Sequence, residues 1–263
     1  MEFNVNKYNK SNKLQVRDAN DLIKRINNEN IDKKYDIILD IGCGTGNITQ
    51  TLNDKLSVDH IYGVDVDTDM IEFARQHHPK PNITYLSQDI SVDWDQLSPQ
   101  IRSLESKVSL IFTNHCFHWI VNKENAVKNI ERLLNKSAKI YANIYWIIDP
   151  FYLNLSDEEL VIHRKEFMNI PTKEKQLDIW IKLFNGSNLS VISYNFLLKS
   201  AEYELKSFEE NVLPLSTTIR KQYIVDYEKD TQLKNDKIKA QVLANVLKNK
   251  IVSATFGGRD TTG

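Results

Sequence analysis

The chain has 263 residues, 41% of them hydrophobic, and its 34 basic and 35 acidic residues leave a net charge of −1. This length predicts one large domain or one domain with an insertion, and the balanced charge excludes the basic footprint of nucleic-acid binders and polybasic membrane binders. The sequence has no apolar run of membrane length, no signal-peptide core at its N-terminus and too few cysteines for a disulfide framework. We therefore expect a cytoplasmic protein without a nucleic-acid or membrane partner.

The first 34 residues are expected to cover a substrate or cofactor site. Residues 8–19 are too polar for a buried strand and precede a helix. The regular alternation of apolar and charged segments begins at residue 35, so residues 35–148 are predicted to form a cofactor-binding core.

A glycine-rich loop follows the first predicted strand. Residues 35–39 form an apolar run typical of a buried parallel strand, residues 40–46 read Asp-Ile-Gly-Cys-Gly-Thr-Gly, and residues 47–56 are compatible with a helix. Glycines permit a tight turn and the close approach of a ligand, and the helix N-terminus offers free amides. The spacing is GxGxG, not the GxGxxG of dinucleotide binders. With Asp40 leading it, the loop resembles motif I of the class I S-adenosylmethionine-dependent methyltransferases.

The second predicted strand, residues 60–65, ends in an acid. Asp65 lies about 20 residues beyond the glycine loop, where such folds place a carboxylate that accepts hydrogen bonds from ribose hydroxyls. The alternative is that Asp65 caps a helix that starts near Asp69. Asp67 and Thr68 can serve as that cap instead, so we favour the ribose role.

Five apolar runs alternate with helix-compatible segments in the first 150 residues, at 36–41, 60–65, 83–86, 108–113 and 138–148. This alternation predicts a parallel sheet with helices on both faces. Together with the loop motif, it predicts an α/β fold of the Rossmann-like class I methyltransferase type. We expect a mostly parallel seven-stranded sheet and a helical insertion after the fifth strand.

The pattern changes at Asp149-Pro150. The segments predicted beyond this point are a helical insertion at 149–186 with a turn at 185–188, and C-terminal elements at 187–263 comprising a strand at 189–199, helices at about 205–247, a strand at 250–256 and a frayed tail at 257–263. The insertion is interpreted either as a lid over a pocket, because insertions after a late strand lie at the ligand edge of such sheets, or as simple core packing.

An acid also follows the third predicted strand. Asp89 at this position can accept the adenine exocyclic amine, with Ile90 covering the ring. The alternative is that Asp89 caps the helix that contains Trp94, and both roles can coexist.

Two histidines and a tryptophan follow the fourth strand. His115 and His118 are three residues apart, and only Cys116 accompanies them, so a zinc site is disfavoured and no metal is expected. One interpretation is a packed aromatic turn. The other is a substrate wall in which the Trp119 indole N–H and the His118 imidazole donate hydrogen bonds.

The N-terminal segment and the residues after the fourth strand together resemble the insect-type juvenile hormone acid O-methyltransferases. The shared residues outside the glycine loop are Tyr8, Lys10-Ser11-Asn12, Leu14-Gln15, Arg17-Asp18-Ala19, His77-His78, Asp89-Ile90, His118-Trp119-Ile120, Asn129-Ile130 and Leu133-Leu134. The resemblance covers residues 8–145 well and the remainder loosely. The segment 150–184, which should shape an apolar tunnel, is shorter than this family leads us to expect.

The resemblance implies methyl transfer from S-adenosylmethionine to the carboxylate of farnesoic acid or its epoxide, with Gln15 and Trp119 holding that carboxylate. The fold and the methyl donor are shared with the trans-aconitate methyltransferases. A carboxylic acid with a pKa near 4 is ionised at pH 7, so no general base is required. Neutral donors orient the carboxylate without quenching its charge, whereas an arginine would hold the ground state too well.

The candidate residues form two sets. The catalytic set is Gln15, Trp119 and His118, and the cofactor-binding set is Asp40, Gly42, Cys43, Gly44, Gly46, Asp65, Val66, Asp89, Ile90 and Asn114. Three other functions stay open: methylation of another small acid such as a trans-aconitate-like or fatty acid, methylation of an amine or phenol with His118 as base, and a non-catalytic S-adenosylmethionine-binding partner subunit. The GxGxG spacing disfavours a nicotinamide-dependent reductase.

Overall fold

The computed structural model describes residues 5–145, 173–201 and 247–258. The strands are β1 (Lys34–Ile41), β2 (Ser57–Asp65), β3 (Ile83–Ser87), β4 (Val108–Asn114), β5 (Leu134–Tyr145), β6 (Leu189–Ala201) and β7 (Leu247–Gly258). The helices are α1 (Val5–Ser11), α2 (Lys13–Glu29), α3 (Asn47–Lys55), α4 (Thr68–His77), α5 (Pro99–Arg102), α6 (Lys123–Leu133) and α8 (Lys173–Gly186), with 3-10 turns η1 (Trp94–Gln96) and η2 (Phe117–Trp119). The predicted helices at about 205–247, except their last residue, and the first part of the predicted insertion, 149–172, lie outside the described residues.

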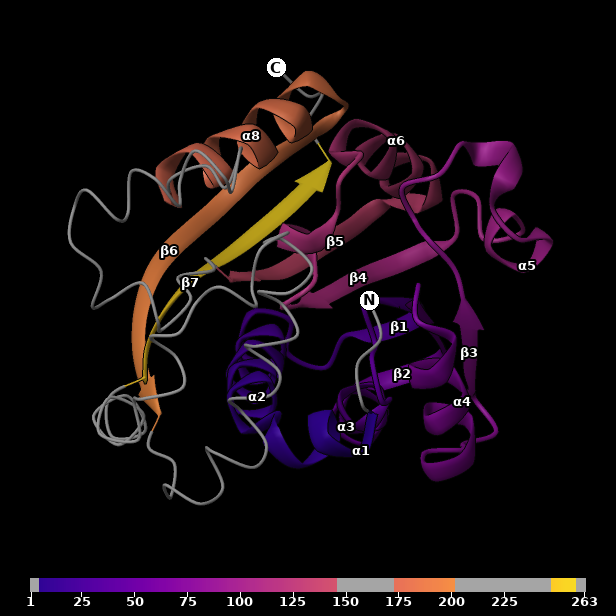
Figure 1. Cartoon of the computed structure of the whole chain (residues 1–263). Coiled ribbons are helices and arrows are strands. Elements are labelled where there is room, and N and C mark those ends of the chain that lie inside the picture. Colours follow the sequence, from indigo (N-terminus) through magenta and orange to yellow (C-terminus); the bar gives the residue numbers. More distant parts are fainter. Residues whose placement is uncertain (1–4, 146–172, 202–246, 259–263) are drawn as a thin grey trace, which may run out of the picture.

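The strands lie in the order β3-β2-β1-β4-β5-β7-β6 (Figure 1). Strands β1 to β5 pair in parallel, which confirms the predicted parallel sheet and its Rossmann-like α/β class. Strands β7 and β6 extend the sheet next to β5 in antiparallel orientation. Because the order reverses between β1 and β4, the carboxyl ends of these two strands flank the place where open α/β sheets bind their ligands.

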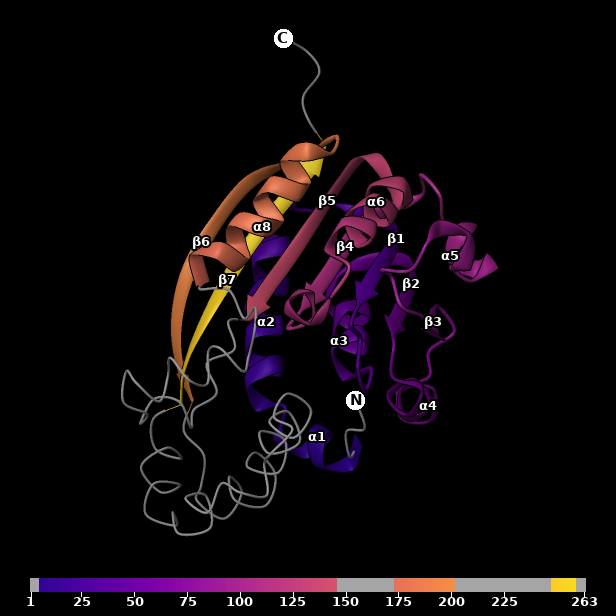
Figure 2. The same ribbon diagram turned by 45° about the horizontal axis from the view of Figure 1, so that its top comes forward.

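Helices cover both faces of the sheet (Figures 1 and 2). Side chains alternate along each strand, so neighbouring residues belong to different cores. In β1, Ile38 packs with buried residues of α2, α3 and α4, whereas Leu39 packs with buried residues of α5, α6 and α8. None of the helices within the described ranges is both long and apolar enough to cross a membrane.

Helix α8 is the described part of the predicted insertion, and it packs as core. Leu177, Trp180 and Phe184 are at most 4% exposed. The Trp180 ring stacks on Phe117 of η2 with centroids 4.5 Å apart. For residues 173–186 the core-packing interpretation therefore holds, and the lid interpretation has no support there.

Candidate active site

The predicted site residues gather at the carboxyl edge of the parallel strands. The glycine loop follows β1, Asp65 ends β2, Asp89 follows β3, and Asn114 ends β4. Parallel strands end at one edge of the sheet, so topology places these segments together at the switch point between β1 and β4.

The glycine loop turns in a conformation that only glycine adopts easily. Gly42 and Gly46 have φ angles of 78° and 81°, in the left-handed region. A Cβ on Gly42 would lie 2.5 Å from Cys116 Sγ, and one on Gly46 would lie 2.7 Å from Ala74 Cβ. At these two positions the loop therefore packs closely against the segment after β4 and against α4.

Cys43 contributes its backbone to the loop. Its N–H donates to the Val64 carbonyl at 3.0 Å, which ties the loop to β2. Its side chain is 4% exposed and packs in the core beside α2, α3 and α4. Burial raises the pKa of the Cys43 thiol well above its ordinary value, so the thiol is inert at neutral pH.

Asp65 is bound to the glycine loop by its side chain. Its Oδ2 accepts from Gly44 N at 2.9 Å, and its Oδ1 accepts from Asp67 N at 3.0 Å. Burial raises the pKa of the Asp65 carboxyl, and these two amides act in the opposite direction. A carboxylate accepts about four hydrogen bonds, so each oxygen keeps capacity for a ligand hydroxyl. Asp67, not Asp65, caps α4 by accepting from Asp69 N and Met70 N.

Asp40 lies beneath the loop at 2% exposure. Thr49 Oγ1 donates to its Oδ2 at 2.7 Å. Burial raises the pKa of Asp40 to about 7, and the Asp65 charge adds to this effect. A cation bound near the loop would favour the ionised form of Asp40.

The two apolar residues predicted to contact a cofactor differ in exposure. Val66 is 66% exposed, whereas Ile90 is 3% exposed and belongs to the core. Ile90 therefore offers almost no surface to an adenine ring. Asp89 is exposed, and its Oδ1 accepts from both Ser91 N and Ser91 Oγ. It does not cap η1, because Asp93 occupies the cap position.

Helix α1 covers the glycine loop. The Tyr8 ring lies against the loop, 3.7 Å from the position that a Cβ on Gly44 would take. Thr45 Oγ1 approaches Asn9 Oδ1 at 3.4 Å. Burial, followed by the charge of Asp65, raises the pKa of the Tyr8 hydroxyl. The N-terminal segment thus contacts the loop that a cofactor would approach.

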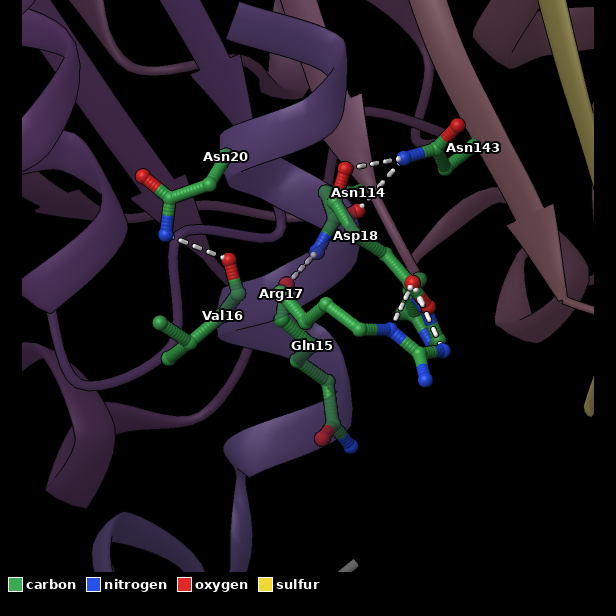
Figure 3. A network of polar contacts seen from close by, with 8 residues as sticks. Gln15, Val16, Arg17, Asp18, Asn20, Asn114 and Asn143 are labelled. Atoms are coloured by element: carbon green, nitrogen blue, oxygen red, sulfur yellow. Dashed lines mark hydrogen bonds and ion pairs between the residues drawn. The ribbon is translucent and has the colours of Figure 1, made fainter. Parts of the chain in front are cut away.

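A polar network joins α2 to β4 and β5 (Figure 3). Asn114 Nδ2 donates to the Gln15 carbonyl at 3.0 Å, and Asn143 Nδ2 donates to Asn114 Oδ1 at the same distance. Both polar ends of the Asn114 side chain are therefore occupied. The Asn114 side chain thus holds the backbone of Gln15 in place.

Asp18 is fully buried in the same network. Its Oδ1 accepts from Arg17 Nε, and its Oδ2 meets His115 Nε2, both at 2.9 Å. Asn143 Nδ2 donates to the Asp18 carbonyl at 3.0 Å. A buried carboxylate is stable only when charged or hydrogen-bonded partners surround it, and this one has partners from α2 itself and from the loop after β4.

The aromatic turn η2 divides its residues between core and surface. Phe117 is fully buried, whereas His118 and Trp119 stay partly exposed with ring centroids 5.0 Å apart. The packed-turn interpretation therefore describes Phe117 but not its two neighbours. Burial, with the charges of His115 and Lys123, holds the pKa of His118 well below its ordinary value.

The two predicted acceptor ligands are connected indirectly. The Gln15 Oε1 atom is buried and has no hydrogen-bond partner among the described residues. Asn114 donates to the Gln15 carbonyl, and the next residue, His115, has its ring centroid 6.5 Å from that of His118, which precedes Trp119.

No set of metal-ligating side chains occurs within the described parts of the chain.

Comparison with known proteins identifies a family that part of this chain resembles. Residues 38–137 match the family described as a methyltransferase domain. The similarity to this family concerns the segment that runs from β1 to the start of β5. The juvenile hormone acid O-methyltransferase of Bombyx mori is 30% identical over 134 residues, 50% of this chain and 46% of that protein. The trans-aconitate 2-methyltransferase of Agrobacterium fabrum is 30% identical over 120 residues, 46% of this chain and 41% of that protein.

A third relative is the malonyl-[acyl-carrier protein] O-methyltransferase of Acetivibrio thermocellus, 29% identical over 136 residues, 51% of this chain and 44% of that protein. The chain thus spans about half the length of the curated relatives that it matches. Among solved structures, MccD has a TM-score of 0.58 at 14% identity, covering 90% of this chain and 96% of its own. The likeness to MccD supports the fold alone.

A phosphoethanolamine N-methyltransferase of Haemonchus contortus in complex with S-adenosyl-L-methionine has a TM-score of 0.53 at 18% identity, covering 92% of this chain and 53% of that chain. This likeness also supports the fold alone. The residues around the glycine loop fit S-adenosylmethionine. Asp65 has spare acceptor capacity, and Val66 presents an apolar surface.

Sequence reasoning did not assign roles to Asp18, His115 and Asn143. A signal for Asp18 was available, because it lies at helical spacing with Leu22 and Ile26 on the buried stripe of α2. A carboxylate on such a stripe requires buried partners. The partners themselves lie about 100 residues away or more, and no local pattern indicates them.

Proposed function

We propose that the protein is an S-adenosylmethionine-dependent O-methyltransferase that forms a methyl ester on the carboxylate of a small acid. The observation that carries this proposal is the glycine loop closed by Asp65, whose carboxylate accepts from Gly44 N and Asp67 N. The similarity to the juvenile hormone acid, malonyl-[acyl-carrier protein] and trans-aconitate methyltransferases supports a carboxylate as the acceptor. Burial lowers the pKa of His118, which agrees with an acceptor that needs no general base. Amines and phenols usually lose a proton in this reaction, whereas a carboxylate is already ionised at pH 7.

The cofactor-binding roles follow from the geometry of the loop. Asp65 accepts hydrogen bonds from the ribose hydroxyls with the lone pairs that Gly44 N and Asp67 N leave free. Val66 covers one face of the adenine, and Asp89 accepts from its exocyclic amine. Asp40 supports the cationic part of the cofactor from beneath the loop. When bound, S-adenosylmethionine supplies an activated methyl group on a sulfonium.

The acceptor carboxylate is held by neutral donors. The Gln15 amide and the Trp119 indole N–H orient one carboxylate oxygen toward the methyl group without neutralising its charge. Gln15 suits this role because Asn114 fixes its backbone, and its side-chain Nε2 group can donate to a carboxylate oxygen. Positioning of this kind lowers a reaction barrier by about 7–11 kcal/mol at best.

The proposed substrate class is an isoprenoid acid similar to farnesoic acid or juvenile hormone acid. The support is the resemblance around Gln15 and Trp119 and the similarity to the Bombyx mori enzyme over half of this chain. A trans-aconitate-like acid or a fatty acid is the alternative, because the trans-aconitate relative is equally identical over a similar length. Residues 150–172, expected to shape the acyl pocket, lie outside the described residues.

The test is a transfer assay with labelled S-adenosylmethionine. Wild-type protein is incubated with isoprenoid, fatty and tricarboxylic acids, and with amines and phenols as competing acceptors. Label released by mild base identifies a methyl ester and supports the proposal. Base-stable label on an amine or phenol contradicts it. Binding of S-adenosylhomocysteine without transfer to any acceptor would instead favour a non-catalytic partner subunit.

A further inference from the structure

Buried polar contacts give helix α2 one defined position on the sheet (Figure 3). Asn114 Nδ2 donates to the Gln15 carbonyl and Asn143 Nδ2 donates to the Asp18 carbonyl, each at 3.0 Å. Between these points Asn143 also donates to Asn114, and His115 Nε2 meets Asp18 Oδ2 at 2.9 Å. Water cannot replace a bond broken in such a buried place, so the contacts fix both the rotation and the height of the helix.

The loop after β4 is held by the same network in a strained conformation. His115 has a φ of 58°, in the left-handed region that is costly for residues other than glycine. Its N–H donates to the Asn143 carbonyl at 3.0 Å, and its imidazole contacts Asp18. Such a conformation persists only where the surrounding contacts over-determine it. Three residues further on, the His118 ring lies beside the Trp119 ring.

We infer that Asp18 is a positioning residue that holds the two halves of the acceptor site together. One half is α2, which carries Gln15, and the other is the loop of His115 that leads to Trp119. The inference rests on the proposed function, because it takes Gln15 and Trp119 as the donors to the acceptor. Asp18 does not act on the substrate itself. It acts through its Oδ2 contact to His115 and through its carbonyl, which Asn143 holds.

Arg17 keeps the Asp18 carboxylate suited to this role. Its Nε donates to Oδ1 at 2.9 Å, so the charge of the buried carboxylate has a partner on its own helix. The second oxygen is directed to the loop after β4. Without the His115 contact, we expect the loop and α2 still to fold against the sheet, but the loop that leads to Trp119 would lose its bond to the helix that carries Gln15.

Two substitutions of His115 test this role against a purely structural one. In His115→Gln the longer amide can still donate to Asp18, whereas in His115→Asn the side chain is too short. Asparagine tolerates a positive φ better than glutamine does. If His115 matters only for the backbone conformation of the loop, His115→Asn should therefore be the more active variant. If His115 acts through its contact with Asp18, His115→Gln should be the more active variant. Leu22→Ala, a buried residue of the same helix with no contact in the network, serves as the stability control.

The measurements are kcat and KM for the acid, the affinity for S-adenosylhomocysteine, and the indole N–H resonance of Trp119. We expect His115→Asn and Asp18→Asn to lower kcat about tenfold to a hundredfold, to leave the cofactor affinity within about twofold and to shift the resonance. His115→Gln and Leu22→Ala should retain most of kcat and the wild-type resonance.

Equal kcat and an unchanged resonance in His115→Asn and His115→Gln would overturn the inference, as would a more active His115→Asn. If wild-type protein methylates no acid, the proposed function fails, but the resonance still decides whether Asp18 and His115 position Trp119.

Discussion

The cofactor edge and the acceptor edge of this site are held by different means. At the cofactor edge, backbone amides make the contacts, and the Gly44–Asp65 bond joins residues only 21 positions apart. At the acceptor edge, side chains make them, and the contacts of Asp18 with His115 and Asn143 span 97 and 125 positions. The first edge is therefore encoded locally, and the second depends on the whole sheet being assembled.

This difference predicts how each edge responds to substitution. Changes at the cofactor edge should act on cofactor affinity or on the stability of the loop, because the contacting groups are backbone atoms and carboxylates beside it. Changes at the acceptor edge should act on turnover while cofactor affinity stays intact. A variant that mixes the two effects would show that the edges are coupled.

The largest expected effect is that of Asp65→Ala on cofactor affinity. The substitution removes two proposed hydrogen bonds to the ribose, each worth about 1.5–3 kcal/mol because the acceptor is charged. The dissociation constant for S-adenosylhomocysteine should rise at least about a hundredfold, measured by calorimetry. Asp89→Ala is the matched control, and it should weaken the binding of S-adenosylhomocysteine by only about the energy of one such bond. Unchanged affinity in Asp65→Ala would remove the ribose assignment.

Gly42→Ala should have the second largest effect. The new Cβ would lie 2.3 Å from Cys116 Cβ at a φ of 78°, so steric overlap adds to backbone strain. We expect a loss of unfolding free energy of about 2–5 kcal/mol, measured by urea titration. A Cβ on Gly186, the last residue of α8, meets nothing within 4 Å, so Gly186→Ala is the control and should be nearly neutral. Similar losses in both variants would contradict the close packing of the loop.

Gln15→Ala and Trp119→Phe test the acceptor edge. Each should lower kcat/KM for the acid about a hundredfold while the affinity for S-adenosylhomocysteine stays intact, because neither residue contacts the proposed cofactor position. Trp119→Phe keeps most of the ring and loses the N–H, so it separates hydrogen bonding from packing. If both residues hold one carboxylate, the double variant should lose little more than either single variant. Strictly additive losses would show that they act on different groups.

The pH dependence of stability tests Asp40. Its pKa rises from 3.8 to about 7 on burial, so between these values the folded chain binds more protons than the unfolded chain. The contribution of Asp40 to the free energy of unfolding is therefore fully present below pH 4. It is lost as the pH rises toward and through 7, at about 1.4 kcal/mol per pH unit. Between pH 5 and pH 8, the cofactor-free wild type should lose about 2–3 kcal/mol relative to Asp40→Asn. If urea titration gives the same pH dependence of unfolding free energy for both proteins, the raised pKa of Asp40 is contradicted.

The same comparison explains what the sequence predicts. Strand β1, the glycine loop and helix α3 follow from a contiguous pattern, and the alternation of apolar runs predicts the five parallel strands. The arrangement at Asp18 could not be predicted, because its partners come from β4 and β5. Ile90 was expected to cover an adenine ring beside Asp89, but after β3 its side chain packs in the core. Local patterns indicate elements, and only assembly decides which face a loop residue takes.

The smallest expected effect distinguishes Val66 from Ile90. Val66→Ser should raise the dissociation constant for S-adenosylhomocysteine about three- to fivefold, because a small apolar area of about 0.5–1 kcal/mol is removed from the proposed adenine contact. Its effect on stability should be negligible, since Val66 is 66% exposed. Ile90→Val should do the opposite and cost about 0.5–1.5 kcal/mol of unfolding free energy without changing cofactor affinity, because the side chain is buried. Calorimetry and urea titration on both variants measure the two quantities. If Ile90→Val weakened cofactor binding and Val66→Ser did not, the adenine would lie against the loop after β3 instead of the end of β2.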